Sequence, residues 1–269
     1  MKDLLKLYSI ESVHDTDGEQ EIFKWLCQYL DNLNVEYKTL GNNIYKLTGN
    51  KVILSAHLDQ VKTNGKAEHF FMFDNKIIKG YNKNYQRTSL GADDKNGVWI
   101  ILKMLENCSQ IDFIISCGEE MGCVGIKELE QAGVLNCISD KQICLVLDRK
   151  GNNDILKGGG SDVYCSTLAQ DLCNFIDDNM VVTTGSISDT RVICEHCESV
   201  NMSTAYFNPH TENEETDFDV LKKLLDTVSN IVGEFTHYPT KPSVYFKKKV
   251  YNSYNKNSFY YGRLDDELL

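Results

Sequence analysis

This chain contains several short, continuous apolar runs, and a potential metal ligand follows most of them. Runs of about four to eight apolar residues between helical segments are typical of buried parallel strands. Asp93, within residues 91–97, is an exception because it opens a helix-like stretch. Ligands bind an open α/β sheet beyond the carboxyl ends of its strands, so these side chains are expected to meet at one edge of a sheet, as a divalent metal site requires. The runs and the ligands that follow them are 52–56 with His57, 113–118 with Glu119 and Glu120, 143–147 with Asp148, and 203–207 with His210.

Helical and strand-like segments alternate along the chain. This alternation predicts an α/β fold, a three-layer sandwich with a mixed, mainly parallel central sheet. Residues 60–90 are mostly polar and are expected to form a loop over the site, with a hairpin at 70–78 that turns at Asp74 and Asn75. The glycine-rich residues 157–161 are expected to form a flexible turn. The spacing of apolar residues predicts helices over 19–33, 94–107, 125–132, 161–178 and 218–236, and strands over 35–40, 43–47, 51–56, 111–116, 143–147, 180–183 and 200–207.

The C-terminal part of the chain differs in character from the rest. Residues 1–240 are interpreted as one catalytic domain, and residues 241–269 as an extension that is rich in Tyr, Asn and Lys and has an acidic end. The extension is expected to add a strand or to pack on the domain as a tail. Docking on a partner and partial disorder are the alternatives.

Composition argues against several classes of protein. The net charge of −11 disfavours a nucleic-acid binder and attachment to anionic lipid, because both need a basic surface. No apolar stretch reaches the length of about 18 residues that a membrane span needs, and the early charges of residues 1–7 are unlike a signal peptide. Most of the ten cysteines lie inside apolar runs, where a free thiol behaves as a small buried hydrophobe. A reduced, cytoplasmic protein is therefore expected.

Two acidic features beside the candidate ligands suggest catalysis. Asp59 lies two residues after His57, on the same side of an extended chain, and can hold the ring nitrogen that does not bind metal. Glu119 and Glu120 are adjacent, so their charges repel unless a cation lies between them. With one of them on a metal, the other can act as a general base. Alone, such a pair is more typical of a solvated turn.

Five motifs in order strengthen this interpretation. They are residues 57–59 (HLD), 91–97 (GADDKNG), 118–125 (GEEMGCVG), 148–149 (DR) and 208–212 (NPHTE). In this order they resemble the co-catalytic zinc exopeptidases, a superfamily that includes tripeptidase-T-like enzymes, glutamate carboxypeptidases and zinc aminopeptidases. The N-terminal helix and the strand near residues 41–45 are also similar to the superfamily.

The resemblance implies a dinuclear metal centre that activates a water for the hydrolysis of a peptide bond. Zinc suits a mixed set of imidazole and carboxylate ligands, and cobalt or manganese would also fit. Asp59 would orient a histidine ligand, and Glu119 would be the general base. The implied ligands are Asp93 as the bridge, His57 and Asp148 for one ion, and Glu120 and His210 for the other.

One departure from the superfamily concerns the lid. Many relatives carry a lid or dimerisation domain between the Asp148 motif and the block that matches residues 185–190, whereas only residues 149–184 separate the two here. The lid domain is therefore expected to be absent, as in the compact aminopeptidases, and the oxyanion needs a donor from elsewhere. Tyr206, just before the His210 motif, is the candidate because a phenol can donate to an oxyanion.

The predicted function is that of a metal-dependent exopeptidase of short peptides, an aminopeptidase or tripeptidase, with homo-oligomers possible. A carboxypeptidase or N-acyl-amino-acid amidohydrolase is the alternative. Either would bind a carboxylate, commonly through arginine, and the chain has four arginines, with Arg149 and Arg191 near the motifs. Acidic groups that suit a free ammonium include Asp189 and Glu212. The second alternative is a catalytically silent binding protein that keeps its metal, against which an intact Glu119 argues.

Overall fold

A computed structural model of the chain describes residues 1–108, 111–139, 142–176 and 179–237. The extension predicted at 241–269 and its boundary at residue 240 lie outside these residues. In the described part of the chain, no helix combines the length and the apolar character needed to cross a membrane.

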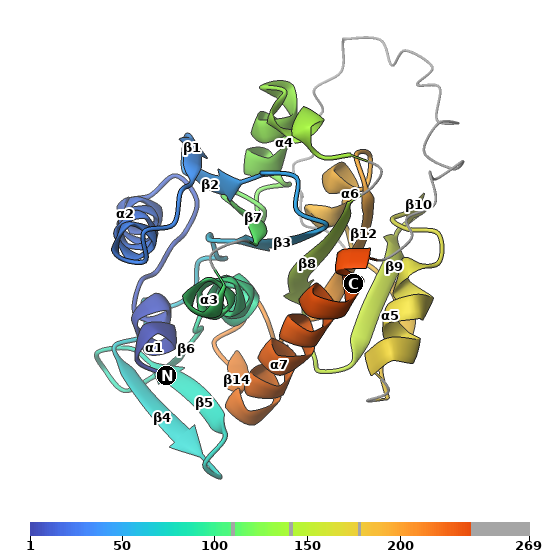
Figure 1. Cartoon of the computed structure of the whole chain (residues 1–269). Helices are drawn as coiled ribbons and strands as arrows, with labels where there is room; N and C mark the ends of the chain where they lie inside the picture. Colours follow the sequence, from blue (N-terminus) through green and yellow to red (C-terminus); the bar gives the residue numbers. More distant parts are fainter. Residues whose placement is uncertain (109–110, 140–141, 177–178, 238–269) are drawn as a thin grey trace, which may run out of the picture.

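The described residues form a nine-stranded central sheet (Figure 1). Its strands are β1 (Lys38–Leu40), β2 (Asn43–Lys46), β3 (Val52–His57), β7 (Asp112–Ser116), β8 (Ile143–Arg149), β9 (Asp154–Gly159), β10 (Asp162–Val163), β11 (Val181–Gly185) and β12 (Glu198–Ser203). They lie in the order β1-β2-β7-β3-β8-β12-β9-β10, and β11 pairs with β9. Neighbours are parallel from β7 through β3 and β8 to β12, and between β9 and β11. The mixed sheet with a parallel centre confirms the prediction.

Helices cover both faces of this sheet and complete the three predicted layers (Figure 1). Strand β3 shows why its sequence is continuously apolar. Leu54 and Ala56 belong to the hydrophobic cluster that includes α1, α2, α3 and α7, whereas Ile53 belongs to the cluster that includes α4 and α6. The helices are α1 (Lys2–Tyr8), α2 (Asp17–Asn32), α3 (Ala92–Asn107), α4 (Val124–Gln131), η1 (Val134–Cys137), α5 (Leu168–Ile176), α6 (Thr190–Ile193), α7 (Phe218–Glu234) and η2 (Phe235–His237).

The prediction of a loop over residues 60–90 is wrong, because much of this stretch forms a second sheet. Its strands are β4 (His69–Phe73), β5 (Ile77–Tyr81), β6 (Arg87–Thr88), β13 (Tyr206–Phe207) and β14 (Glu215–Asp217). The predicted hairpin is confirmed: β4 pairs with β5, and Asp74 and Asn75 take positive φ angles at the turn. Strand β6 also pairs with β5, whereas β13 and β14 come from far along the chain: Thr216 of β14 pairs with Ile78. A partner so distant along the chain leaves no local pattern in residues 60–90.

Three further segments differ from the predictions. The turn predicted at residues 157–161 is shorter than expected, since residues 157–159 belong to β9, which pairs with β10, β11 and β12, and residues 160 and 161 form the turn. The helix predicted at 161–178 begins only at Leu168, because β10 precedes it. The strand predicted at 200–207 is divided: β12 lies in the central sheet and β13 in the second sheet. Ala205, with a φ of 64°, interrupts it.

The carboxyl ends of the parallel strands meet at one edge of the central sheet. Strand β3 ends at His57, β7 ends just before the turn that contains Glu119, and β8 ends at the Asp148 motif. Register agrees with this placement, because His57 pairs with Ser116 across β3 and β7.

Candidate metal centre

Five side chains from separate elements form one cluster at this edge. His57 Nε2 lies 3.4 Å from Asp93 Oδ1 and 3.5 Å from Asp148 Oδ1. His210 Nε2 lies 3.1 Å from Asp93 Oδ2 and 2.9 Å from Glu120 Oε1. Asp93 thus presents one oxygen to each histidine, and each histidine has a second carboxylate beside it. The structure brings all five predicted ligands together around Asp93.

The cluster carries more negative charge than its own side chains can balance. Buried carboxylates require a cationic partner or a metal, because removing their charge from water is unfavourable. His57 Nε2 and Glu120 Oε1 are buried and have no hydrogen-bond partner of suitable geometry. Divalent cations would compensate the charge and coordinate both atoms, so the residues fit such ions. Together with the neighbouring Asp94 and Glu119, the cluster brings five carboxylates against two imidazoles: Asp93, Asp94, Glu119, Glu120 and Asp148 against His57 and His210.

Asp94 lies next to the cluster and was not identified by the sequence analysis. It is fully buried, its Oδ2 accepts from the backbone N–H of His57 at 3.2 Å, and its Oδ1 accepts from the N–H of Gly97 at 3.0 Å. Gly97 is required here because an added Cβ would lie 2.3 Å from the carbonyl oxygen of Leu147. The start of α3 can therefore approach β8 and β3 closely, which brings Asp93 to the strand ends.

Asp59 contacts both the histidine and the turn that carries the glutamates. His57 Nδ1 lies 3.1 Å from the backbone carbonyl oxygen of Asp59 and 3.4 Å from its carboxylate Oδ1. The same carboxylate accepts from the backbone N–H groups of Glu119 and Glu120, at 3.0 and 3.2 Å. Asp59 is fully buried, so it holds the backbone of this turn relative to the end of β3. This second set of contacts was not predicted.

Glu119 lies at the His57 side of the cluster. Its side chain is 12% exposed, and its Oε2 is 4.0 Å from His57 Nε2. Burial, and after it the negative charge of Asp148, raise the pKa of Glu119 to about 9. Cys123 contacts its other oxygen, with 3.9 Å between Sγ and Oε1. Glu119 therefore has the position of a group that can exchange protons with a molecule bound at the cluster.

Tyr206 lies beside a carboxylate of the cluster. Its hydroxyl donates to Asp148 Oδ1 at 3.2 Å, and the ring is buried.

Asn201, a polar residue inside the apolar strand β12, holds the backbone of Asp148 through its side-chain amide. The amide oxygen accepts from the N–H of Asp148, and the amide nitrogen donates to its carbonyl oxygen. A lone asparagine between Val200 and Met202 is the signal by which the sequence could have revealed this contact.

Tyr206→Phe is expected to lower turnover by about 10²–10³ with little change in KM, if the phenol donates to the oxyanion of the substrate. The measurement is kcat and KM on a short peptide at saturating zinc, with metal content determined in parallel. Wild-type turnover would exclude this role. A fall in metal content instead would show that the hydroxyl serves Asp148.

The arginines that a carboxylate clamp would use are engaged elsewhere. Arg149 donates through Nε and Nη2 to Asp154 Oδ2, both at 3.0 Å. Arg191 pairs with Asp162 at 2.9 Å. Arg87 donates to the carbonyl oxygen of residue 214, and residue 263 lies outside the described ranges.

The two acidic groups suggested for an ammonium differ in position. Asp189 is buried and accepts a hydrogen bond from Ser116, and it lies close to Glu119 and Cys123. Asp189 therefore lies in the protein interior, and its use as an ammonium ligand is not supported. Glu212 is exposed, on the segment that carries His210.

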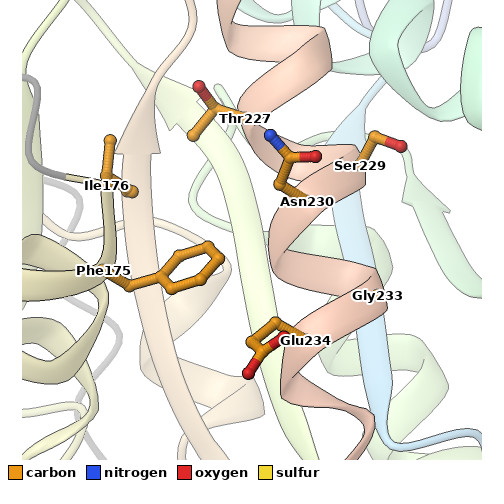
Figure 2. A pocket seen from close by; sticks show the side chains of 7 residues that line it. All are labelled: Phe175, Ile176, Thr227, Ser229, Asn230, Gly233 and Glu234. Atoms are coloured by element: carbon orange, nitrogen blue, oxygen red, sulfur yellow. The ribbon is translucent and has the colours of Figure 1, made fainter.

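A cavity of about 470 Å³ lies apart from this cluster, between α5 and α7 (Figure 2). Figure 2 shows Phe175 pointing across it toward α7. Its lining includes none of the predicted site residues; it consists of Phe175, Ile176, Thr227, Ser229, Asn230, Gly233 and Glu234.

Comparisons by sequence identify few relatives. No family model matches the chain. The uncharacterized protein YqjE of Bacillus subtilis is 30% identical over 153 residues, a match that includes 49% of this chain and 39% of that protein. The chain thus spans less than half the length of this relative.

Comparisons by structure show the fold clearly. A tripeptidase from Staphylococcus aureus has a TM-score of 0.69 at 16% identity, with 88% of this chain and 97% of that chain covered. The aminopeptidase PepT from Bacillus cereus has a TM-score of 0.70 at 17% identity, over 87% and 97% of the two chains. The TET1 peptidase of Pyrococcus horikoshii has a TM-score of 0.66 at 14% identity, over 86% and 99%. The exopeptidase-like fold predicted from the motifs is thereby confirmed.

Proposed function

We propose that this chain is a metal-dependent exopeptidase that hydrolyses short peptides, an aminopeptidase or tripeptidase. The observation that carries the proposal is the cluster at the strand ends, in which Asp93 lies between two histidine–carboxylate pairs and Glu119 lies beside them. The solved structures that share the fold are named as a tripeptidase and as aminopeptidases, which supports the same reaction class.

Two divalent ions are proposed for the cluster. His57 and Asp148 would hold one, Glu120 and His210 the other, and Asp93 would bind both. Zinc suits this mixture of imidazole and carboxylate, and cobalt or manganese would also fit. Such ions would supply Lewis acidity and would lower the pKa of a water, so that it can give up a proton as it attacks an amide.

The residues of the chain itself would perform the proton transfers. Glu119, through Oε2 on the His57 side, would accept the proton of the attacking water and deliver it to the departing amine. Asp59 would keep this carboxylate in place, because it binds the backbone N–H of Glu119. The environment that raises the pKa of Glu119 makes its carboxylate a stronger base and so favours the first transfer.

The free N-terminus is proposed as the recognised end of the peptide. Arg149 and Arg191 are both paired with aspartates, so neither offers an unpaired guanidinium to a C-terminal carboxylate. Glu212, exposed on the segment that carries His210, is a carboxylate that would attract an ammonium. A carboxypeptidase or N-acyl-amino-acid amidohydrolase remains the alternative within the same fold. A silent metal-containing binding protein is disfavoured because it would not need Glu119.

Tripeptides with a free N-terminus are expected to be cleaved, with near-complete loss of cleavage when the amine is acetylated. The physical reason is that acetylation removes the positive charge that the Glu212 carboxylate would attract. The measurement is the rate of product formation on matched peptides that are free, N-acetylated or C-amidated. Unchanged cleavage of the acetylated peptides, with loss on amidation, would favour the carboxypeptidase alternative.

A cytoplasmic location and homo-oligomers are further parts of the proposal. Cys117, Cys123, Cys144 and Cys197 are buried as free thiols, which suits a reducing compartment. The TET1 peptidase is described as assembling into a tetrahedron or a large octahedral shell. A shared fold supports the possibility of self-association in this chain.

A further inference from the structure

Glu214 is a buried carboxylate that the proposed mechanism does not use. Its side chain accepts three hydrogen bonds, and it is 1% exposed. Oε2 accepts from Ser89 Oγ at 2.5 Å and from the backbone N–H of Ala92 at 3.1 Å, and Oε1 accepts from the backbone N–H of Asp93 at 3.1 Å. Both oxygens are therefore directed at the loop that begins α3.

Glu214 connects the segment of His210 to the segment of Asp93. It lies four residues after His210, in the turn that precedes β14, and its own backbone N–H donates to the carbonyl oxygen of Thr211. Arg87 fixes the other side of the turn by donating to the carbonyl oxygen of Glu214 at 3.1 Å. The segment that carries His210 is thus bonded directly to the backbone of Asp93.

A carboxylate is the side chain that suits this site. Its partners are three neutral donors, two backbone N–H groups and one hydroxyl, and only a carboxylate offers an acceptor oxygen on both branches. A glutamine would direct an NH₂ group at one of these donors. A buried backbone N–H that loses its acceptor is unfavourable, so the loop would shift.

We propose that Glu214 is a positioning residue that fixes Asp93 relative to His210 and thereby sets the affinity of the cluster for divalent ions. The proposal rests on the proposed function in one respect: it takes Asp93 as a metal ligand. Groups that hold a ligating carboxylate commonly affect metal affinity by about 10-fold to 100-fold. Glu214 acts through the backbone of Asp93 and not by contact with substrate.

Glu214→Gln is expected to weaken zinc binding by about 10-fold to 100-fold. The measurement uses the full chain, stripped of metal and titrated with Zn²⁺ in competition with a chromogenic chelator. Circular dichroism and thermal unfolding of the metal-free proteins show whether the fold is retained. Glu215→Gln is the matched control: this neighbour pairs with Lys79 at 3.2 Å on the second sheet and should bind zinc as the wild type does.

Ser89→Ala provides a milder test should Glu214→Gln not fold. The hydroxyl donates to Glu214 and accepts from the N–H of Gly91 at 2.9 Å, so its loss removes one of the three hydrogen bonds to the carboxylate and should weaken zinc binding about fivefold. Unchanged affinity in folded Glu214→Gln, or in Ser89→Ala where the first variant does not fold, would overturn the inference. A wild-type protein that binds no zinc would instead refute the proposed function, and the positioning role with it.

Discussion

Glu119→Gln is expected to reduce turnover by about 10²–10⁴ while the protein still binds two divalent ions. The amide has nearly the shape of the carboxylate but cannot accept a proton from water. Glu119 lies beside the cluster, 4.0 Å from His57 Nε2, and its backbone is held by Asp59, so the substitution should leave the ligands in place. The measurement is kcat on a tripeptide together with elemental analysis of the purified variant.

Glu120→Gln is the matched control, because it changes the adjacent residue in the same way. Glu120 Oε1 lies 2.9 Å from His210 Nε2, so this variant should lose metal affinity, and its activity should recover partly in excess zinc. If instead Glu119→Gln lost metal and Glu120→Gln kept it, the roles of the two glutamates would be reversed.

Asp93→Ala is expected to remove both ions and to lower activity to the background rate. Its two oxygens lie 3.4 Å from His57 Nε2 and 3.1 Å from His210 Nε2, so it belongs to both halves of the cluster. Loss of any other predicted ligand would affect one half directly. The measurement is metal content by elemental analysis, which should fall from two ions per chain to fewer than one, with activity equal to that of the chelated wild type.

Asp154→Ala serves as the control for this variant. Asp154 is a partly buried aspartate that pairs with Arg149, the neighbour of Asp148 in the chain, and not with a histidine. The Asp154→Ala variant should retain two ions per chain. An Asp93→Ala protein that keeps two ions would refute the bridging role, and a wild-type protein with only one ion would refute the dinuclear centre.

The parallel centre of the fold could be predicted because strands that are buried on both faces have continuously apolar sequences. In β3, Ile53 and Leu54 lie in different hydrophobic clusters, so consecutive positions carry apolar side chains. The resulting runs are short, continuous and apolar, unlike the alternating pattern of a half-exposed strand. Once such runs are taken as parallel, their carboxyl ends must share one edge, and His57 and Asp148 are expected close together.

Other elements could not be predicted because their partners are distant in the chain. Strand β9 is rich in glycine and became a strand through pairing with β11 and β12. The second sheet depends on Thr216 beside Ile78, a pairing that no local pattern in either segment indicates. Intrinsic preference for strand is weak compared with such pairing, so these segments appeared to be turns or loops.

The sequence by itself determined which side chains are present for chemistry and that parallel strands would bring them to one edge. Only the tertiary structure decided how they are held. Asp59 holds the backbone of Glu119, Asn201 that of Asp148, and Glu214 that of Asp93, each through hydrogen bonds between residues more than 50 positions apart. The sequence determines which groups a side chain is able to bind. A hydrogen bond also requires its donor and acceptor to lie within about 3 Å of each other. That distance is set by how the sheets and α3 pack together.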